Sequence, residues 1–226
     1  MAAAKSQGLE KYETCTELDS HADTCVVGKH VLLFQDFNRP VNISGYDANL
    51  RTVENCKTVS AAMTYDDIRT GETVMLIVHQ AISLPHLDNN LLNPMQLRMN
   101  DVRVSEQAKF LTENPKDEDH ALIVPGMDGG DPLLIPLSLN GVVSYLPTYK
   151  PTTEQLETCR RFELTSEIPE WDLHDHFADQ EDAMVDADGH VKETGDRALT
   201  KQSIMSFSVS KTCAITLNNQ LSFYHY

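Results

Sequence analysis

The sequence is short of basic side chains. Its 226 residues include 18 lysines and arginines against 34 aspartates and glutamates, which gives a formal net charge of −16. Proteins that hold nucleic acid through its phosphates need a basic surface, so this balance argues against direct nucleic-acid binding. It argues in the same way against docking on anionic membranes.

Long apolar runs and paired cysteines are also missing. No run approaches the ~20 residues that a membrane helix needs, and the start of the chain holds no apolar stretch long enough for a signal peptide. The cysteines are odd in number, and no two form a Cys-x-x-Cys pair. We therefore expect no disulfide framework and an intracellular, cytoplasmic location. The five cysteines are Cys15, Cys25, Cys56, Cys159 and Cys213.

The acidic residues are concentrated toward the C-terminus. Residues 163–196 hold twelve aspartates and glutamates but one basic residue, Lys192, and they lack a sustained apolar period. This composition predicts a solvated segment, so we expect residues 151–226 to form an acidic, partly disordered linker or tail. A loose metal site is the alternative, because a His-x-His pair lies among carboxylates. Its ligands would be Asp172, His174, Asp175 and His176.

The first 150 residues favour a mainly β structure. Short apolar and β-branched runs alternate with turn residues, as at residues 31–34 and 73–78. Asn140-Gly141 lies between two such runs and predicts a hairpin, which we expect to form a β-hairpin extension over residues 113–150. Pro136 places the first of these two runs at a sheet edge.

One short segment carries chemistry. Leu18-Asp19-Ser20-His21-Ala22-Asp23-Thr24 runs from an apolar approach into small and polar residues. A carboxylate at the end of a strand can be held there by backbone N–H groups and by a neighbouring hydroxyl. One such carboxylate is a weak activator of water, but two at ~3 Å cannot both ionise, so they share a proton. One then acts as base on a bound water while the other donates to a scissile carbonyl.

This segment resembles the active-site loop of the retropepsins, Asp-Ser/Thr-Gly-Ala, and is most similar to the protease region of Ty1/copia-type retrotransposon Pol polyproteins. Residues 84–97 agree, since they resemble the copia-type stretch Pro-x-Leu-x-x-Asn-Leu-Leu-Ser-Val-Ser-Gln-Leu. The resemblance implies a retropepsin-like acid protease domain over residues 12–112, a closed β-barrel or sandwich with one short C-terminal helix. In retropepsins the Asn-Leu-Leu opens that helix. A helix is also predicted over residues 91–99, with Asn90 as its N-cap and Pro94 in its first turn.

The resemblance also implies roles for residues of the loop. Asp19 is the catalytic carboxylate, and Ser20 supports the site by hydrogen bonding across a dimer. Ala22 and Asp23 line the cleft and hold the substrate backbone. A flap, a β-hairpin that closes over the substrate, is expected at residues 43–47 with Gly45 near its tip, or at the later turn of residues 69–72. An ordinary turn glycine is the alternative for Gly45.

A single Asp-Ser motif of this kind occurs in the chain, whereas a two-lobed pepsin-like enzyme needs two. We therefore expect a homodimer whose site forms on a twofold axis, each copy giving Asp19. The resemblance implies a polypeptide substrate, the polyprotein from which the chain derives, in the cytoplasm or in virus-like particles. The reaction requires no cofactor, and no metal is expected.

His21 departs from the family pattern, which has Gly at this position. That Gly allows close approach of the backbone to the catalytic pair. A histidine adds a Cβ and a titratable ring, so it either lines the cleft or weakens the site. The alternative function is therefore a catalytically inactive, β-rich, retroelement-derived module with a binding or structural role.

Two further patterns overlap the same segment. Cys15, His21, Cys25 and His30 form a run that suggests zinc, although its spacing matches neither a zinc finger nor a zinc knuckle. Cys25 with His21 could also form a nucleophile and its base, but no third, orienting group can be named. A buried thiol at the start of a strand is the alternative for Cys25.

Overall fold

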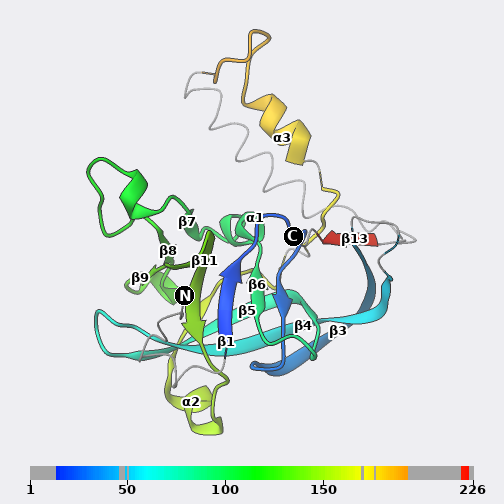
Figure 1. Cartoon of the computed structure of the whole chain (residues 1–226), viewed down its shortest axis with the longest axis vertical. Helices are drawn as coiled ribbons and strands as arrows, with labels where there is room; N and C mark the ends of the chain where they lie inside the picture. The colour runs from blue at the N-terminus through cyan, green and yellow to red at the C-terminus, as the bar shows by residue number, and fades with distance from the viewer. Residues whose placement is uncertain are drawn as a thin grey trace, which may run out of the picture. The chain divides into compact units, whose positions relative to one another are not determined.

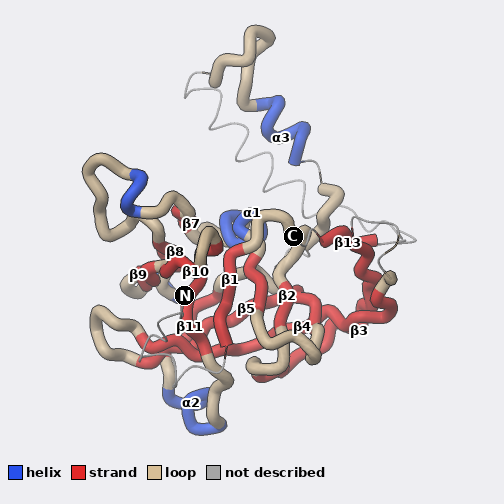
Figure 2. The backbone as a smooth tube through the Cα atoms, viewed as in Figure 1, coloured by secondary structure: helices blue, strands red, loops and turns tan. Residues whose placement is uncertain are grey.

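The computed structural model describes residues 14–45, 49, 51–168, 171–175, 177–192 and 220–223. In this part of the chain strands predominate over helices, which confirms the predicted mainly β structure (Figures 1 and 2). None of the described helices has the length and apolar character needed to cross a membrane. The strands are β1 (Thr14–Leu18), β2 (Val26–Val27), β3 (Leu32–Gly45), β4 (Val53–Asp66), β5 (Thr73–Ser83), β6 (Asn90–Leu92), β7 (Arg103–Ser105), β8 (Ala121–Val124), β9 (Leu133–Pro136), β10 (Ser138–Asn140), β11 (Val143–Thr148), β12 (Arg160–Glu163) and β13 (Gln220–Phe223). The helices are α1 (Pro94–Arg98), α2 (Thr153–Thr158) and α3 (Phe177–Ala183), with 3-10 turns at Lys109–Leu111 and Met127–Gly129.

The chain divides into two compact units, residues 1–170 with 219–226 and residues 171–218. The first unit contains a ten-stranded sheet in the order β10-β11-β1-β6-β2-β5-β4-β3-β13, with β12 also paired to β5, and a small sheet in the order β7-β8-β9. The end strands β10 and β13 are not paired with each other. The closed barrel implied by the resemblance is therefore not found among the described strands, because closure needs a ladder between the two ends.

Both sheets bury side chains in one core. β5 is buried at nearly every position, because both of its faces are covered: Leu76 and Val78 belong to the main cluster, while Met75 and Ile77 belong to a second cluster against which Leu156 packs. A strand covered in this way has a nearly continuous apolar sequence. Leu76 and Val78 of β5 share a cluster with Leu122 of β8 and Ile135 of β9.

The packed unit extends further along the chain than the expected boundaries at residues 112 and 150. Of the expected β-hairpin extension over residues 113–150, β10 and β11 belong to the main sheet, because β11 pairs antiparallel with β1, whereas β8 and β9 belong to the small sheet. β12 pairs parallel with β5, and its Phe162 and the following Leu164 are buried. These two apolar residues anchor the beginning of the acidic segment. Residues 151–168 therefore belong to the packed unit, where the composition predicts the start of a solvated tail.

The second unit is acidic and has little regular structure among its described residues. α3 lies next to Trp171, whose ring centroid is 5.5 Å from that of Phe177. A turn follows, in which Val185 and Val191 form an isolated antiparallel bridge. Asp186 Oδ1 accepts a hydrogen bond from the backbone N–H of His190 at 2.9 Å and holds this turn.

The helix predicted over residues 91–99 is shorter and starts later. α1 begins at Pro94 with Asn93 as its N-cap, whereas Asn90–Leu92 forms β6. The prediction that Asn90 caps the helix, and that Asn-Leu-Leu opens it, is therefore wrong. The physical reason is tertiary, because the Asn90 side chain donates to Thr16 Oγ1 at 3.0 Å and accepts from the backbone N–H of Gly28 at 2.9 Å.

The hairpin predicted at Asn140-Gly141 is present between β10 and β11. Asn140 pairs with Val143, so Gly141 and Val142 are the two turn residues, one position later than expected. Gly141 has a φ of 62°, which fits a turn with glycine at its first central position. Pro136 ends β9, which lies at the edge of the small sheet, as its missing N–H predicts.

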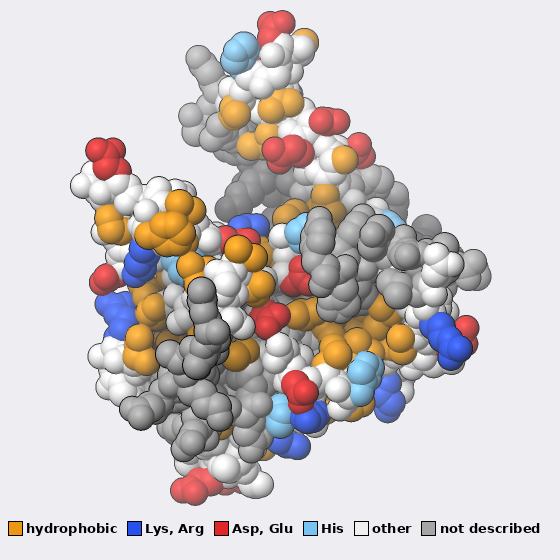
Figure 3. All heavy atoms as spheres, viewed as in Figure 1, with side chains coloured by type: hydrophobic (Ala, Val, Ile, Leu, Met, Phe, Trp, Pro, Cys, Tyr) orange, Lys and Arg blue, Asp and Glu red, His pale blue; other side chains and the backbone are white. Residues whose placement is uncertain are grey.

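On the face drawn in Figure 3, the lysine and arginine side chains are dispersed among other residue types. Phosphate binding depends on basic side chains gathered on one surface. The described residues on this face therefore show no gathering of basic side chains.

Candidate active site

Asp19 directly follows β1, where three strands meet. β6 lies between β1 and β2, parallel to the first and antiparallel to the second. The backbone N–H of Asp19 donates to the carbonyl of Leu92 at 3.0 Å, so the loop leaves the sheet where β6 ends. The Asp19 side chain remains 22% exposed. The residue is thus fixed through its backbone, and its side chain is partly exposed to solvent.

Two buried amide side chains hold the loop from the interior. Asn93 Nδ2 donates to the carbonyl of Ala22, while Asn93 Oδ1 caps α1 by accepting from the backbone N–H of Gln96 at 2.6 Å. Gln96 Oε1 in turn accepts from the backbone N–H of Cys25 at 2.9 Å and from the Thr24 hydroxyl at 3.1 Å. Asn93 and Gln96 each bond a loop residue that lies 71 positions earlier in the chain, so the shape of the loop depends on contacts distant in the sequence.

His21 lies beside the carboxylate. Its backbone N–H donates to Asp19 Oδ1 at 2.9 Å, and its ring Nδ1 is 3.8 Å from the same oxygen. The ring is 58% exposed. Among the described residues, no lysine or arginine forms an ion pair with this carboxylate.

The other predicted loop residues lie at different depths. Ser20 is exposed and Asp23 is half-buried, whereas Ala22 is buried. The carbonyl of Ala22 already accepts the hydrogen bond from Asn93. The loop therefore brings Asp19, Ser20 and His21 together at the surface, while Ala22 supports it from beneath.

The two flap candidates occupy different turns. Gly45 is the last residue of β3, in the long β3–β4 hairpin, and residues 46–47 of this candidate lie outside the described residues. The turn of residues 69–72 joins β4 to β5, and the Asp67 carboxylate holds it by accepting from the Arg69 N–H at 2.9 Å and the Thr70 hydroxyl at 2.7 Å. A turn held by these hydrogen bonds is poorly suited to be a mobile flap.

Neither the thiol alternative nor the metal alternative is supported by the geometry of the described residues. Cys25 is fully buried, and burial raises the pKa of its thiol to about 12, so it is not an activated nucleophile. Within the part of the chain that the structure describes, no three His, Cys, Asp or Glu side chains are grouped to hold a metal ion. His176, one of the ligands considered for the acidic segment, lies outside the described residues.

A buried polar network on β5 was not predicted. His79 is buried, its Nδ1 lies 2.8 Å from Ser60 Oγ, and its Nε2 lies 3.8 Å from Glu163 Oε1. Ser60 also donates to Gln35 Oε1 at 3.2 Å. This set of residue types resembles a hydrolase triad, but Ser60 is fully buried and no substrate reaches it. The clue in the sequence was His79-Gln80, two polar residues inside the apolar run that forms β5.

Two buried histidines, His79 and His120, should make the fold sensitive to acid. Burial lowers the pKa of His79, with partial opposition from Glu163 and Glu167, and burial together with Lys109 lowers the pKa of His120. The unfolded chain, with a histidine pKa of about 6.5, binds protons that the folded chain resists. Stability is therefore complete above about pH 6.5 and is lost as the pH falls through the lowered folded values.

Urea unfolding between about pH 7.5 and about pH 5 measures this effect. The free energy of unfolding can fall by at most about 1.4 kcal/mol per pH unit for each histidine. His79→Asn removes one titrating ring but keeps a polar group near Ser60. We expect a shallower dependence of the unfolding free energy on pH in the variant. Equal slopes in the two proteins would show that His79 does not titrate differently on folding.

Comparison with protein-family models, with curated proteins and with solved structures gives no significant match to this chain. The functional interpretation therefore depends on the Asp19 loop and on the resemblance of its sequence.

Proposed function

We propose that the chain is an aspartic endopeptidase of the retropepsin type, active as a homodimer in which each copy contributes Asp19. The placement of Asp19 carries this proposal. Its side chain is partly exposed after the end of β1, and the loop behind it is fixed by Asn93 and Gln96. A general acid–base group needs access to substrate and a supported orientation.

The chemistry uses two Asp19 carboxylates that share one proton across a twofold axis. The ionised carboxylate takes a proton from a water molecule, whose oxygen then bonds to the peptide carbonyl carbon. The protonated carboxyl donates to the carbonyl oxygen. The C–N bond then breaks as the carboxyl that took the proton from water gives it to the amine nitrogen. The other carboxylate takes a hydroxyl proton from the tetrahedral intermediate, which leaves as the carboxylic acid product, so the dyad again shares one proton. This sequence requires neither a metal nor a covalent intermediate.

The neighbouring residues have supporting roles in the proposal. Ser20 donates hydrogen bonds across the dimer at the base of the site, and Asp23 holds the substrate backbone. The β3–β4 hairpin with Gly45 closes over the substrate. The proposed substrate is the retrotransposon-type polyprotein that contains the chain, cleaved inside the cell. A retropepsin-like fold for the first unit is supported by its mainly β structure and by the short helix α1 after β6.

One observation favours a second candidate, a catalytically inactive β-rich module. His21 adds a side chain where the retropepsin loop has glycine, and its ring lies 3.8 Å from Asp19. A ring in this position occupies space close to where a second carboxylate would approach. The module would then keep the loop and bind peptides without cleaving them.

A casein cleavage assay on the wild-type protein tests the first candidate. We expect cleavage that rises below about pH 6, as a dyad sharing one proton predicts. It should resist chelators, and its specific activity should increase with protein concentration because the site needs two copies. A strict monomer in analytical ultracentrifugation at tens of micromolar, or a flat pH profile with loss of activity in chelator, would contradict the proposal.

A further inference from the structure

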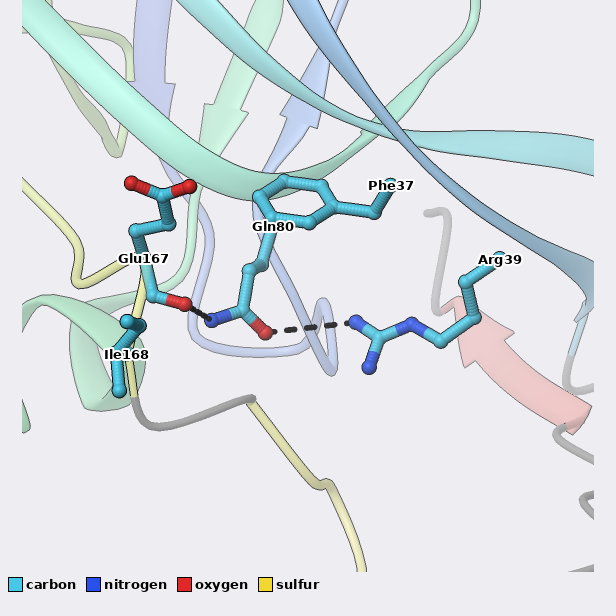
Figure 4. Close-up of a pocket in the computed structure, with 5 residues that line it drawn as sticks. All are labelled: Phe37, Arg39, Gln80, Glu167 and Ile168. Carbon is cyan, nitrogen blue, oxygen red and sulfur yellow. Dashed lines mark hydrogen bonds between the residues drawn. The ribbon is translucent and has the colours of Figure 1, made fainter.

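A cavity of about 310 Å³ lies on the first unit, outside the Asp19 loop. Figure 4 shows the side chains that line it, which come from β3, from β5 and from the segment after β12. Such concave sites with a few converging polar groups are the usual places for ligand binding. The lining residues are Phe37, Arg39, Gln80, Glu167 and Ile168.

A β-bulge builds the cavity. Val59 of β4 pairs with Ala81, but Ala61 pairs with Val78, so His79 and Gln80 both face the single residue Ser60. Gln80 has a φ of 54°, in the left-handed region that residues other than glycine rarely adopt. Bulges and such backbone outliers re-aim side chains and cluster at functional sites.

The re-aimed Gln80 side chain organises the polar groups of the cavity. Its Nε2 donates to the carbonyls of Ser166 and Glu167 at 3.0 and 2.9 Å. Its Oε1 accepts from Arg39 Nη2 at 3.4 Å, which directs the guanidinium toward the cavity (Figure 4). The Glu167 carboxylate points away from Arg39 in this view and accepts from Gln35 Nε2 at 2.7 Å. The cavity is thus lined by one cation, Arg39, by one carboxylate, Glu167, and by the apolar side chains of Phe37 and Ile168.

The cavity is connected to the candidate active site through a shared loop. The Thr24 hydroxyl lies 3.5 Å from the carbonyl of Gln80, as a donor to it. Thr24 belongs to the loop that begins at Asp19, and these five steps along the chain span at most about 17 Å. Asp19 and Gln80 therefore lie within the length of about eight extended residues of each other.

We propose that this cavity binds the carboxylate side chain of an aspartate or glutamate in an extended peptide, with Arg39 as the specificity-determining residue. The planar guanidinium matches a carboxylate with two parallel hydrogen bonds. Phe37 and Ile168 cover the methylene groups of the bound side chain. The choice of a peptide as ligand rests on the proposed peptidase function, whereas the choice of a carboxylate rests on the cavity itself.

Binding to the Asp19→Asn protein tests this inference without any cleavage. The probes are fluorescent peptides of about eight residues on one extended scaffold, in which a single glutamate is moved through every position and paired with glutamine at the same place. In at least one register we expect the glutamate peptide to bind about tenfold more tightly, the effect of a hydrogen-bonded charge. Free glutamate at the same concentration should not compete.

Variants of Arg39 identify the group that discriminates. Arg39→Gln, added to the Asp19→Asn protein, should abolish the tenfold preference, and Arg39→Lys should keep part of it because the charge remains without the planar fork. Circular dichroism confirms that each variant is folded. Equal binding of glutamate and glutamine peptides in every register would overturn the inference, as would an unchanged preference in Arg39→Gln. Effective competition by free glutamate would replace the peptide site with one for small carboxylates.

The two proposals fail in different ways. Discrimination between the peptides together with an inactive wild-type protein would leave the cavity site intact and favour the binding module. If the wild-type protein cleaves casein but the Asp19→Asn protein binds glutamate and glutamine peptides equally, the peptidase proposal stands and the carboxylate site is rejected.

Discussion

Replacing Asp19 with asparagine is expected to reduce peptidase activity by at least about a hundredfold, because the site loses its general acid and base. Asparagine has nearly the same shape and can still accept the hydrogen bond from the His21 N–H, so the loop should keep its fold. Initial rates on casein at equal protein concentration measure the effect. Unfolding curves in urea verify that stability is retained.

Asp101→Asn is the matched control for this substitution. Asp101 is exposed and has a φ of 59°, a backbone conformation that asparagine also tolerates. It should leave the rate unchanged. Equal rates for the wild-type and Asp19→Asn proteins would reject Asp19 as the catalytic group.

Mixing the two proteins separates a shared dyad from a site within one chain. With equal amounts and free exchange, about a quarter of the dimers contain two wild-type copies. If both carboxylates are needed, activity falls to about a quarter of that of the same total amount of wild-type protein. A fall to one half would mean that each chain acts by itself.

Asn93→Ala is expected to be the most damaging substitution for the fold of the site. It removes the N-cap of α1, which contributes about 1 kcal/mol, and leaves the buried carbonyl of Ala22 without its donor, which costs about 1–3 kcal/mol more. We therefore expect a loss of about 2–4 kcal/mol in the free energy of unfolding. Urea unfolding at neutral pH measures the loss, and peptidase activity should fall with it because the Asp19 loop loosens.

Thr152→Ala provides the comparison for the cap by itself. Thr152 caps α2 through a hydrogen bond from the Gln155 N–H at 3.2 Å, and its loss should cost about 1 kcal/mol. The difference between the two variants then reports the tie between Asn93 and Ala22. If Asn93→Ala costs no more than Thr152→Ala, that tie contributes nothing to stability.

Acid should have opposing effects on chemistry and fold. The proposed dyad gains activity below about pH 6, while His79 and His120 lose folding free energy over the same interval because their pKa values are lowered in the folded chain. The acid limb of any activity profile should therefore coincide with the onset of unfolding. Because asparagine does not titrate, His79→Asn should keep the protein folded, and therefore active, at lower pH.

Local pattern was sufficient for several features. Alternating apolar runs predicted a mainly β chain, and the missing N–H of Pro136 placed β9 at an edge. Gly141 marked a two-residue hairpin because it tolerates a positive φ. Asp19 was selected by its neighbours, and it directly follows β1.

The remaining features depend on partners distant in the sequence. Asn90–Leu92 has the local pattern of a helix start but forms a strand, because β1 and β2 both offer it backbone hydrogen bonds. Phe162 is one apolar residue in an acidic stretch, and only the edge of β5 makes it part of the core. The bulge at Gln80, and with it the Arg39 cavity, arises from the register between β4 and β5. Composition and turn chemistry are local properties of the chain, so the sequence by itself determined the β class, the hairpin and the candidate carboxylate. Strand order, register and burial are set by pairings between segments tens of residues apart, and only the tertiary structure decided those.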